Sequence, residues 1–259
     1  MMNSKEKKLF LKMGYFIREK VLSPNECQKI SQILFKAISK EKRLHQKYKG
    51  KNSKMKDYGM VMVCPMYGNI FLKLLQNKKL IDPFNKILGK DCIIYAYTSS
   101  SMPPKKGNFS NRIHVDCPRF IKNYITNMGC TIALDDFCIE NGATQFMPGS
   151  HLSAKTPSMS SFKKKRKHFV CKKGSVFFFN GRLFHSGGKN STNSWRHGLT
   201  LNVARYWMKQ RFDMSAILKN KIKIKNLNPE IKQKLGFTTL PPNSLEEYYG
   251  YGMKKSYSK

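Results

Sequence analysis

The feature of this sequence that most constrains its fold is a pair of potential ligands, His114 and Asp116, together with a distant histidine, His185. Residues i and i+2 of a β-strand point to the same face, so the side chains of His114 and Asp116 can reach one ion from a strand. His185 follows Asp116 by 69 residues and comes shortly after the apolar run 174–180. A fold that unites the three residues must therefore bring distant strands together.

Two imidazoles and one carboxylate are the ligand set of non-haem Fe(II) oxygenases, which leave further coordination positions open. Arg196 follows His185 by eleven residues and precedes the alternating run 198–207. A guanidinium at this place suits the carboxylate of an organic co-substrate. Histidine, carboxylate and arginine side chains at the ends of adjacent strands indicate a site at the mouth of a β-barrel, where small molecules often bind. Each of these motifs alone is common by chance, so the prediction of a metal site rests on their occurrence together.

The segment 136–151, Asp-Phe-Cys-Ile-Glu-Asn-Gly-Ala-Thr-Gln-Phe-Met-Pro-Gly-Ser-His, resembles the D-x-x-x-x-N-G-x-x-x-x-x-P-G-S-H signature of the phytanoyl-CoA dioxygenase family. His114-Val-Asp116 resembles the H-x-D ligand pair of that family. The segment from His185 to Asn190 resembles its H-x-S-G-x-N pattern, and Arg196 stands at the family's spacing from the second histidine. The resemblance covers about residues 8–248, nearly the whole chain.

This resemblance implies a mainly β fold, a double-stranded β-helix (a jelly-roll or cupin-like barrel) with helices packed on one side. It implies Fe(II) bound by His114, Asp116 and His185, and 2-oxoglutarate held through its far carboxylate by Arg196. O2 would then oxidise a substrate, with release of succinate and CO2. Thr131 is a further co-substrate candidate by resemblance, and the alternative for it is an ordinary β-branched strand residue.

Two further details bear on the co-substrate and on the reaction. Many family members have serine where this chain has Gly187, so one hydroxyl contact is missing or is supplied by Ser186 or Thr200. Asn111 precedes the ligand pair and is a candidate to line the pocket. Halogenating relatives replace the ligand carboxylate with a small residue, whereas this chain keeps Asp116. We therefore expect hydroxylation or a related oxidation.

Capping and turn residues predict several local elements. Ser23-Pro-Asn-Glu26 is a capping box with proline at the first helical position, which predicts a helix to about Ser39. We expect a second helix over 79–88, interrupted near Pro83, and strands over 92–97 and 143–147. The basic segments 40–60 and 152–167 are predicted to be loops near the site entrance. His151 is expected to be a packing or loop residue, because the ligand triad is complete without it.

Composition agrees with one enzyme domain spanning residues 1–259, since a chain with 40% hydrophobic residues can build a substantial core. The longest apolar runs are far shorter than the roughly 20 residues that a membrane helix needs. The N-terminus lacks the apolar region of a signal peptide. Seven scattered cysteines do not suggest a disulfide framework. We therefore expect a cytoplasmic protein with reduced thiols and no membrane partner.

The net charge of +34 is the second unusual feature. Nucleic-acid sites rely heavily on arginine, but 40 of the 49 basic residues are lysine. A general compositional bias is therefore favoured over a nucleic-acid partner. Residues 141–212 contain no acidic side chain, so loops there could draw in 2-oxoglutarate and an anionic substrate. An acyl-CoA, a carrier-protein thioester, a phosphate ester or an acidic sugar would qualify.

Three functions stay open on the sequence alone. The first is a 2-oxoglutarate-dependent hydroxylase that acts on a small or carrier-bound metabolite. The second is a basic protein associated with nucleic acid, and the third is a catalytically silent barrel kept for binding. The intact triad and Arg196 favour the first.

Overall fold

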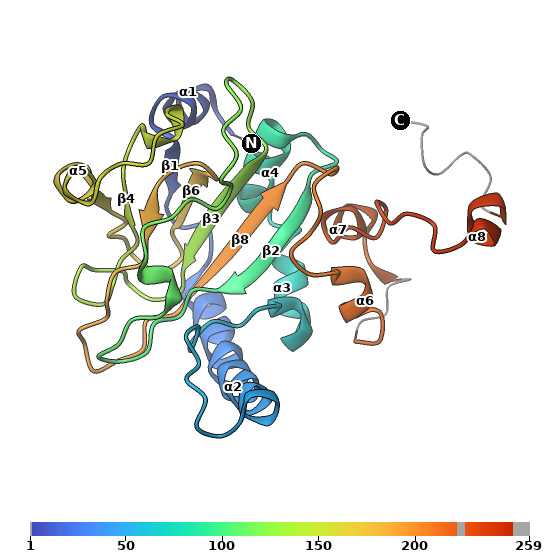
Figure 1. The fold of residues 1–259 in the computed structure, drawn as a ribbon, viewed down its shortest axis with the longest axis horizontal. Helices are drawn as coiled ribbons and strands as arrows, with labels where there is room; N and C mark the ends of the chain where they lie inside the picture. The colour runs from blue at the N-terminus through green and yellow to red at the C-terminus, as the bar shows by residue number, and fades with distance from the viewer. Residues whose placement is uncertain (1, 222–225, 251–259) are drawn as a thin grey trace.

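Two antiparallel β-sheets form the centre of the computed structural model, which describes residues 2–221 and 226–250 (Figure 1). The larger sheet has the order β1-β6-β3-β8-β2, and the smaller has the order β5-β4-β7. The strands of the larger sheet are β1 (Tyr15–Arg18), β2 (Ile93–Ser99), β3 (Asn127–Ala133), β6 (Val176–Asn180) and β8 (Gly198–Ala204). Those of the smaller sheet are β4 (Gln145–Phe146), β5 (Lys167–His168) and β7 (His185–Ser186). The predicted domain 1–259 also includes residues 1, 222–225 and 251–259, which lie outside the described residues.

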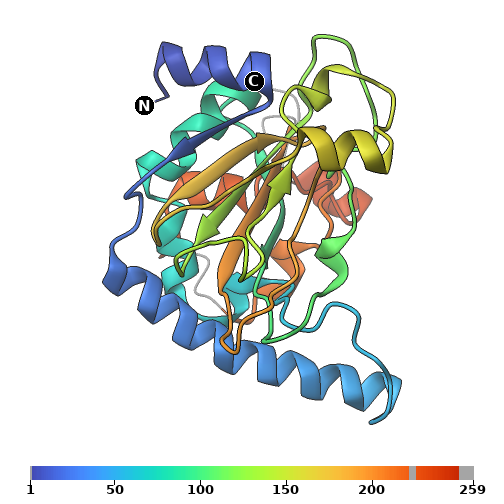
Figure 2. The same ribbon diagram turned by 90° about the vertical axis from the view of Figure 1, so that its left-hand side faces the viewer.

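Helices cover one face of the larger sheet (Figures 1 and 2). The α-helices are α1 (Ser4–Met13), α2 (Pro24–Lys49), α3 (Asn69–Leu74), α4 (Lys78–Leu88), α5 (Met159–Lys165), α6 (Met214–Leu218), α7 (Pro229–Lys234) and α8 (Leu245–Gly250). Three short 3-10 helices are η1 (Cys64–Tyr67), η2 (Phe109–Asn111) and η3 (Ser150–Leu152). Among the described residues, no helix has both the length and the apolar character needed to cross a membrane.

The two faces of the larger sheet have different surroundings, as the alternation along β3 shows. Met128, Cys130 and Ile132 belong to the main hydrophobic core, which includes buried residues of α2, α3, α4, α6 and α7. Ala133 belongs to a second, smaller core. Because alternate residues of a strand face opposite ways, Thr131 points with Ala133 toward the smaller sheet. The space between the two sheets is therefore the interior in which a site can form.

Helix α2 is longer than the sequence analysis predicted. It was expected to end near Ser39, with a loop over 40–60, but it continues to Lys49. Residues 40–49 are mainly lysine, arginine, glutamate, glutamine and leucine, which are good helix formers, and the first glycine after them is Gly50. Glu41 also accepts hydrogen bonds from the backbone N–H of Met62 at 3.1 and 3.2 Å, which holds the extra turns.

Helix α4 was predicted to be interrupted near Pro83, and this was wrong, because it runs unbroken from Lys78 to Leu88. A proline inside a helix lacks the N–H that would bond the carbonyl four residues earlier. Here that carbonyl belongs to Lys79, and it accepts a hydrogen bond of 2.6 Å from Nη1 of Arg18. A side chain from β1 therefore offsets part of the proline's cost.

The segment 152–167 is also more regular than the predicted loop. The Ser158 side chain caps α5 by accepting from the backbone N–H of Ser161, and buried Phe162 anchors the helix. The strand expected over 143–147 is shorter and consists of β4 alone. His151 was predicted to be a packing or loop residue, and this is confirmed. It is buried in η3, and its Nε2 lies 3.1 Å from the carbonyl of Leu11.

Candidate metal centre

The structure brings the three predicted ligands together at the edge of the smaller sheet. His114 and His185 form an isolated antiparallel bridge, with reciprocal N–H to carbonyl hydrogen bonds of 2.9 and 3.0 Å. Oδ1 of Asp116 lies 3.7 Å from Nε2 of His114 and 3.9 Å from Nε2 of His185. One ligand atom from each residue lies within 4.8 Å of the other two. The backbone pairing thus sets the spacing of the imidazoles directly.

Both imidazoles are oriented in the same way by backbone carbonyls. Nδ1 of His114 lies 2.7 Å from the carbonyl of Arg112, and Nδ1 of His185 lies 2.9 Å from the carbonyl of Leu183. A carbonyl can only accept, so each Nδ1 carries the proton and each Nε2 keeps a free lone pair. A hydrogen bond from the second ring nitrogen is the usual way in which proteins orient a metal-binding histidine. Both rings therefore present a ligand atom toward Asp116.

The two histidines differ in exposure. The His185 side chain is 10% exposed, whereas that of His114 is 37% exposed. The His185 ring lies against the ring of Phe179, with 4.8 Å between centroids. Burial lowers the pKa of His185, which favours the neutral imidazole that a metal requires. The centre is therefore closed on the side of His185 and open on the side of His114.

Arg196 is a buried cation that forms no ion pair among the described residues, although the charge of Asp135 acts on it and raises its pKa. It is 1% exposed, and Nη1 donates to the carbonyl of Gly142 at 3.0 Å while Nη2 donates to that of Ser100. Its guanidinium carbon lies 4.3 Å from the ring centroid of Phe137, and its Nε has no hydrogen-bond partner. Burial lowers the pKa of Arg196 to about 10, so the group is still charged at neutral pH. Such a charge is costly unless an anion compensates it.

Thr131 lies in a row of three threonines that crosses the larger sheet. Its register partner on β8 is Thr200, and the partner of Thr200 on β2 is Thr98. The residues next to each of them, such as Cys130, Leu201 and Tyr97, pack in the main core, so the threonines face the interior. Sequence analysis had singled out Thr131 and Thr200 but had missed Thr98.

Asn127 and Asn202 also face the interior and were missed. Both are buried, and Nδ2 of Asn127 donates to Oδ1 of Asn202. Oδ1 of Asn127 has no donor. One asparagine on each of two mostly apolar strands was the available signal, because a buried amide needs a partner. With the threonines, they give the β3, β8 and β2 side of the interior a polar lining.

Asn111, Gly187 and Ser186 are the remaining positions that were considered for contacts with the co-substrate. Asn111 is half-buried in η2, and its Nδ2 donates to the carbonyl of Gly187 at 2.9 Å. A Cβ added at Gly187 would lie 2.7 Å from Oγ of Ser110, so a serine hydroxyl already fills the space of the missing side chain. Ser186 is buried and pairs with Gln145, one residue out of phase with His185. Its side chain therefore points away from the face that carries His185.

Arg182 ties together the segments around the triad. Nη1 donates to the carbonyl of Pro118 at 2.7 Å, two residues after Asp116, and Nη2 donates to the carbonyl of Ser153 at 3.0 Å. The backbone N–H of Cys117 donates to the carbonyl of Gly181 at 2.9 Å. These bonds fix the chain immediately after the ligand carboxylate.

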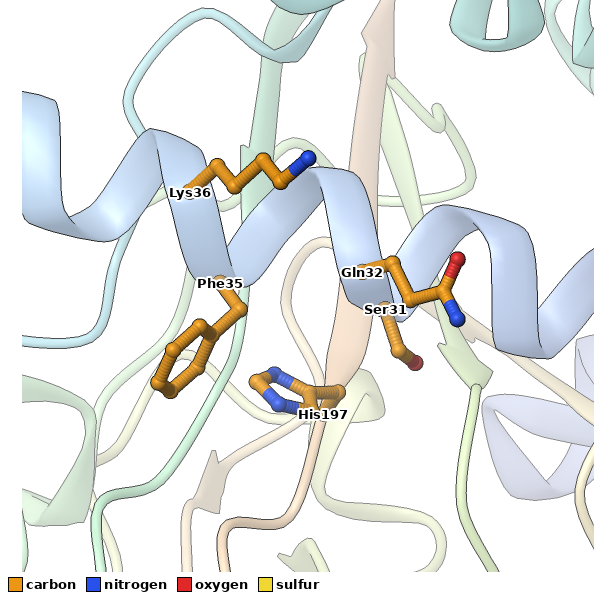
Figure 3. A pocket seen from close by; sticks show the side chains of 5 residues that line it. All are labelled: Ser31, Gln32, Phe35, Lys36 and His197. Atoms are coloured by element: carbon orange, nitrogen blue, oxygen red, sulfur yellow. The ribbon is translucent and has the colours of Figure 1, made fainter.

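A separate surface cavity of about 330 Å³ lies on the other side of the larger sheet, against α2. Ser31, Gln32, Phe35, Lys36 and His197 line it (Figure 3). His197 follows Arg196 in the chain, but Figure 3 shows its ring facing α2. The metal-ligand cluster lies elsewhere, so we assign the chemistry to the interior and not to this cavity.

Comparison with known proteins agrees with the geometry. The model of the family "Phytanoyl-CoA dioxygenase (PhyH)" matches residues 10–198. The uncharacterized protein Mb1539 of Mycobacterium bovis is 24% identical over 252 residues, covering 95% of this chain and 91% of that protein. Dioxygenase trt7 of Aspergillus terreus is 37% identical over 82 residues, which are 30% of this chain and 27% of that one.

Among solved structures, AviO1 from Streptomyces viridochromogenes has a similar fold. The TM-score is 0.58 at 18% sequence identity, and the match covers 80% of this chain and 97% of AviO1. The family model covers well over half of the chain and includes all three potential ligands and Arg196. This chain therefore belongs to the phytanoyl-CoA dioxygenase family.

Proposed function

We propose that this protein is an Fe(II)- and 2-oxoglutarate-dependent dioxygenase that hydroxylates a small or carrier-bound metabolite, with release of succinate and CO2. The observation that carries the proposal is the converging His-Asp-His cluster, in a fold that also buries the guanidinium of Arg196 without an ion pair among the described residues. Family membership supports a dioxygenase in general. The two sheets would then be the halves of a jelly-roll barrel that encloses the site.

The donor atoms fit Fe(II). Two neutral imidazoles and a carboxylate are a facial ligand set that leaves positions for other molecules. His114 and His185 would bind through Nε2, since both Nδ1 atoms are engaged by carbonyls. Bound iron would supply the activation of O2 and the oxidation of the substrate. The protein orients the ligands and, through the packing of His185 on Phe179, keeps water from one side of the centre.

The interior also fits a dicarboxylate co-substrate. Arg196 would compensate its charge with the far carboxylate of 2-oxoglutarate through a charge-assisted pair. Thr131 and Thr200 lie in register on neighbouring strands and would offer hydroxyl groups. We assign the hydroxyl that is missing at Gly187 to Ser110 in preference to Ser186, because Oγ of Ser110 occupies the adjoining space. Asn111 would hold the loop at Gly187 in place.

The charge distribution supports an anionic substrate. No acidic residue occurs in 141–212, a stretch that includes α5, the second histidine and Arg196. Cations around an entrance raise the local concentration of anions and speed their association. A cytoplasmic setting is part of the same proposal, since all seven cysteines are free thiols. Steering predicts that the KM of the true substrate rises with salt.

The test is an anaerobic titration with Fe(II) and 2-oxoglutarate, followed by visible absorbance. Wild type should develop a weak metal-to-ligand charge-transfer band. The band should be lost in His185→Ala and weakened in Arg196→Ala. His168→Ala is the matched control, because His168 lies on β5 outside the ligand cluster. No band in wild type at saturating iron and co-substrate would contradict the proposal and favour a binding barrel.

A further inference from the structure

Six large hydrophobic side chains lie exposed on three segments, the loop 117–126, the end of η3 and the loop after β8. We call them the aromatic rim: Phe120, Ile121, Tyr124, Leu152, Tyr206 and Trp207. Their exposed fractions run from 38% for Phe120 to 62% for Leu152. The loop 117–126 projects beyond the larger sheet, whereas α2 crosses the opposite end (Figures 1 and 2). Single exposed hydrophobic residues are ordinary, but a connected group marks a binding surface.

Two arginines connect the three segments of the aromatic rim. Arg205 lies over the ring of Tyr124 at 4.3 Å, and its Nε donates to the carbonyl of Ile125 at 2.9 Å. This joins Tyr206 and Trp207, which follow Arg205, to the loop 117–126. Arg182 lies 5.7 Å from the ring centroid of Phe120 and also donates to Ser153, the neighbour of Leu152. The three segments that carry the six residues therefore lie next to one another.

The charged residues interspersed with the aromatic rim are all basic. Arg119 and Lys122 flank Phe120 and Ile121, while Lys155 and Lys209 follow Leu152 and Trp207. All four basic side chains are exposed. The sequence contains no aspartate or glutamate in 117–134 or in 141–212. The segments that carry the rim thus combine apolar and aromatic side chains with basic residues and contain no acidic residue.

We infer that the aromatic rim binds the surface of an anionic lipid bilayer. Tyrosine and tryptophan favour the membrane–water interface, because one end of each ring system is apolar and the other polar. Lysine and arginine gain by approaching anionic headgroups. A nucleic acid would satisfy the cations but would leave Ile121 and Leu152 without an apolar partner. The contact is peripheral, since no described helix can cross a membrane.

This inference changes the expectation, based on the sequence, that the protein has no membrane partner. It does not rest on the proposed function, because vesicle binding requires neither iron nor co-substrate. It has a bearing on the site, however. The loop 117–126 follows Asp116 directly, so a protein docked by the aromatic rim would present its candidate metal centre toward the bilayer. An amphiphilic substrate could then enter from the lipid.

The experiment uses the full chain with vesicles of phosphatidylcholine alone or of equal parts phosphatidylcholine and phosphatidylglycerol. The chain has two tryptophans, so Trp195→Phe leaves Trp207 as the sole indole reporter. We expect flotation with the anionic vesicles. The emission of Trp207 should shift to the blue, and the indole should become shielded from iodide. The neutral vesicles should bind at least about fivefold more weakly.

Substitutions separate the apolar and charged contributions. Ile121→Ser combined with Trp207→Ser should weaken flotation at least about tenfold, and Lys122→Gln should weaken it about fivefold. The matched control is Leu44→Ser combined with Tyr48→Ser, on α2. These side chains are 55% and 72% exposed and also lie among lysines, but they are at the opposite end of the molecule. The control should bind like wild type.

Several results would overturn the inference. One is the absence of flotation with anionic vesicles. Another is flotation without a blue shift, or flotation that the control substitutions reduce as much as those in the aromatic rim, since both indicate non-specific attraction by the basic surface. Equal binding to duplex DNA that is unaffected by the Ile121→Ser and Trp207→Ser changes would assign the surface to polyanions instead.

Discussion

The two halves of the space between the sheets are built differently. On the side of β1, β6 and β4, a small core of stacked rings fills it, including Phe146, Phe169, Phe177 and Phe179. On the side of β3, β8 and β2, the inward-facing residues are small or polar: Ala96, Thr98, Asn127, Gly129, Thr131, Thr200 and Asn202. The aromatic half leaves little free space, whereas the polar half offers hydrogen-bonding groups.

The candidate centre lies at the border between these halves. His185 packs on Phe179, and the register partner of Phe179 on β3 is Gly129. A Cβ added at Gly129 would collide with the Phe179 ring, so the glycine makes room for the aromatic half to reach the border. The two halves therefore differ in what they provide: the aromatic half packs against His185, and the polar half carries hydroxyl and amide groups that a bound molecule would contact.

The largest expected effect concerns the stability of the aromatic half. Phe177→Ala should lower the free energy of unfolding by about 4 kcal/mol, because it removes a fully buried ring in contact with several others. Thr200→Val in the polar half should change it by less than about 1 kcal/mol. Urea unfolding of both variants measures the difference. Equal losses of unfolding free energy in the two variants would show that the aromatic half contributes no more to stability than the polar half.

The next effect concerns metal binding at the border. Asp116→Ala should lower the affinity for Fe(II) at least about a hundredfold, since losing even an outer contact of a metal ligand can cost that much. Asp136→Ala is the control, because Asp136 is an exposed acid that pairs with Lys172. Anaerobic equilibrium dialysis against Fe(II) gives both affinities. Retention of tight binding in Asp116→Ala would remove the triad from consideration.

A smaller effect is expected at Arg182, and it tests whether this residue positions the candidate metal centre or only stabilises the fold. Arg182→Lys should weaken Fe(II) binding about tenfold, because lysine cannot bond both Pro118 and Ser153 in the same geometry. Arg205→Lys is matched to it, since Arg205 also bonds two backbone carbonyls and lies on an aromatic ring. That variant should keep the wild-type affinity. Equal weakening in both would indicate a stability effect alone.

In the polar half, the hydroxyl of Thr131 can be tested without changing its shape. Thr131→Val should weaken 2-oxoglutarate binding about fivefold, which corresponds to the loss of one hydrogen bond. Thr131→Ser keeps the hydroxyl and should bind nearly as well as wild type. The charge-transfer titration measures both. Indistinguishable affinities in valine and serine variants would leave Thr131 with a packing role.

The smallest expected effect is a pH dependence of the metal-free protein. Burial lowers the pKa of His151, so the folded state disfavours its protonated form. The unfolded chain takes up this proton below its ordinary pKa of about 6.5. The stability contributed by the neutral ring is therefore complete above that value and falls as the pH drops below it, by at most about 1.4 kcal/mol per pH unit. His151→Gln should flatten urea midpoints measured between neutral and mildly acidic pH.

Sequence reasoning located the potential ligands and Arg196 because their identities and spacing carry the signal. The position of β4 within the predicted strand 143–147 was recognisable for a similar reason, since the glycine and proline residues on either side of it act locally. Thr98 and the pair formed by Asn127 and Asn202 could not be identified in advance. Their importance depends on which strands become neighbours, and that is decided by the whole sheet.

The errors in predicting helices have the same origin. Pro83 remains inside α4 because Arg18, far away in the chain, satisfies the carbonyl that proline leaves free. The aromatic rim was missed because its six residues come from three separate segments. Contacts formed only in the folded protein, such as those of Arg182 and Arg205, bring these segments together.

The buried charge of Arg196, which lacks an ion pair among the described residues, has a thermodynamic consequence. A ligand that binds the folded state alone stabilises it in proportion to the logarithm of its concentration. A dicarboxylate that neutralises this guanidinium would remove a penalty that the empty fold carries. The melting temperature, the resistance to proteases and the lifetime of the protein would then all rise with the supply of that metabolite.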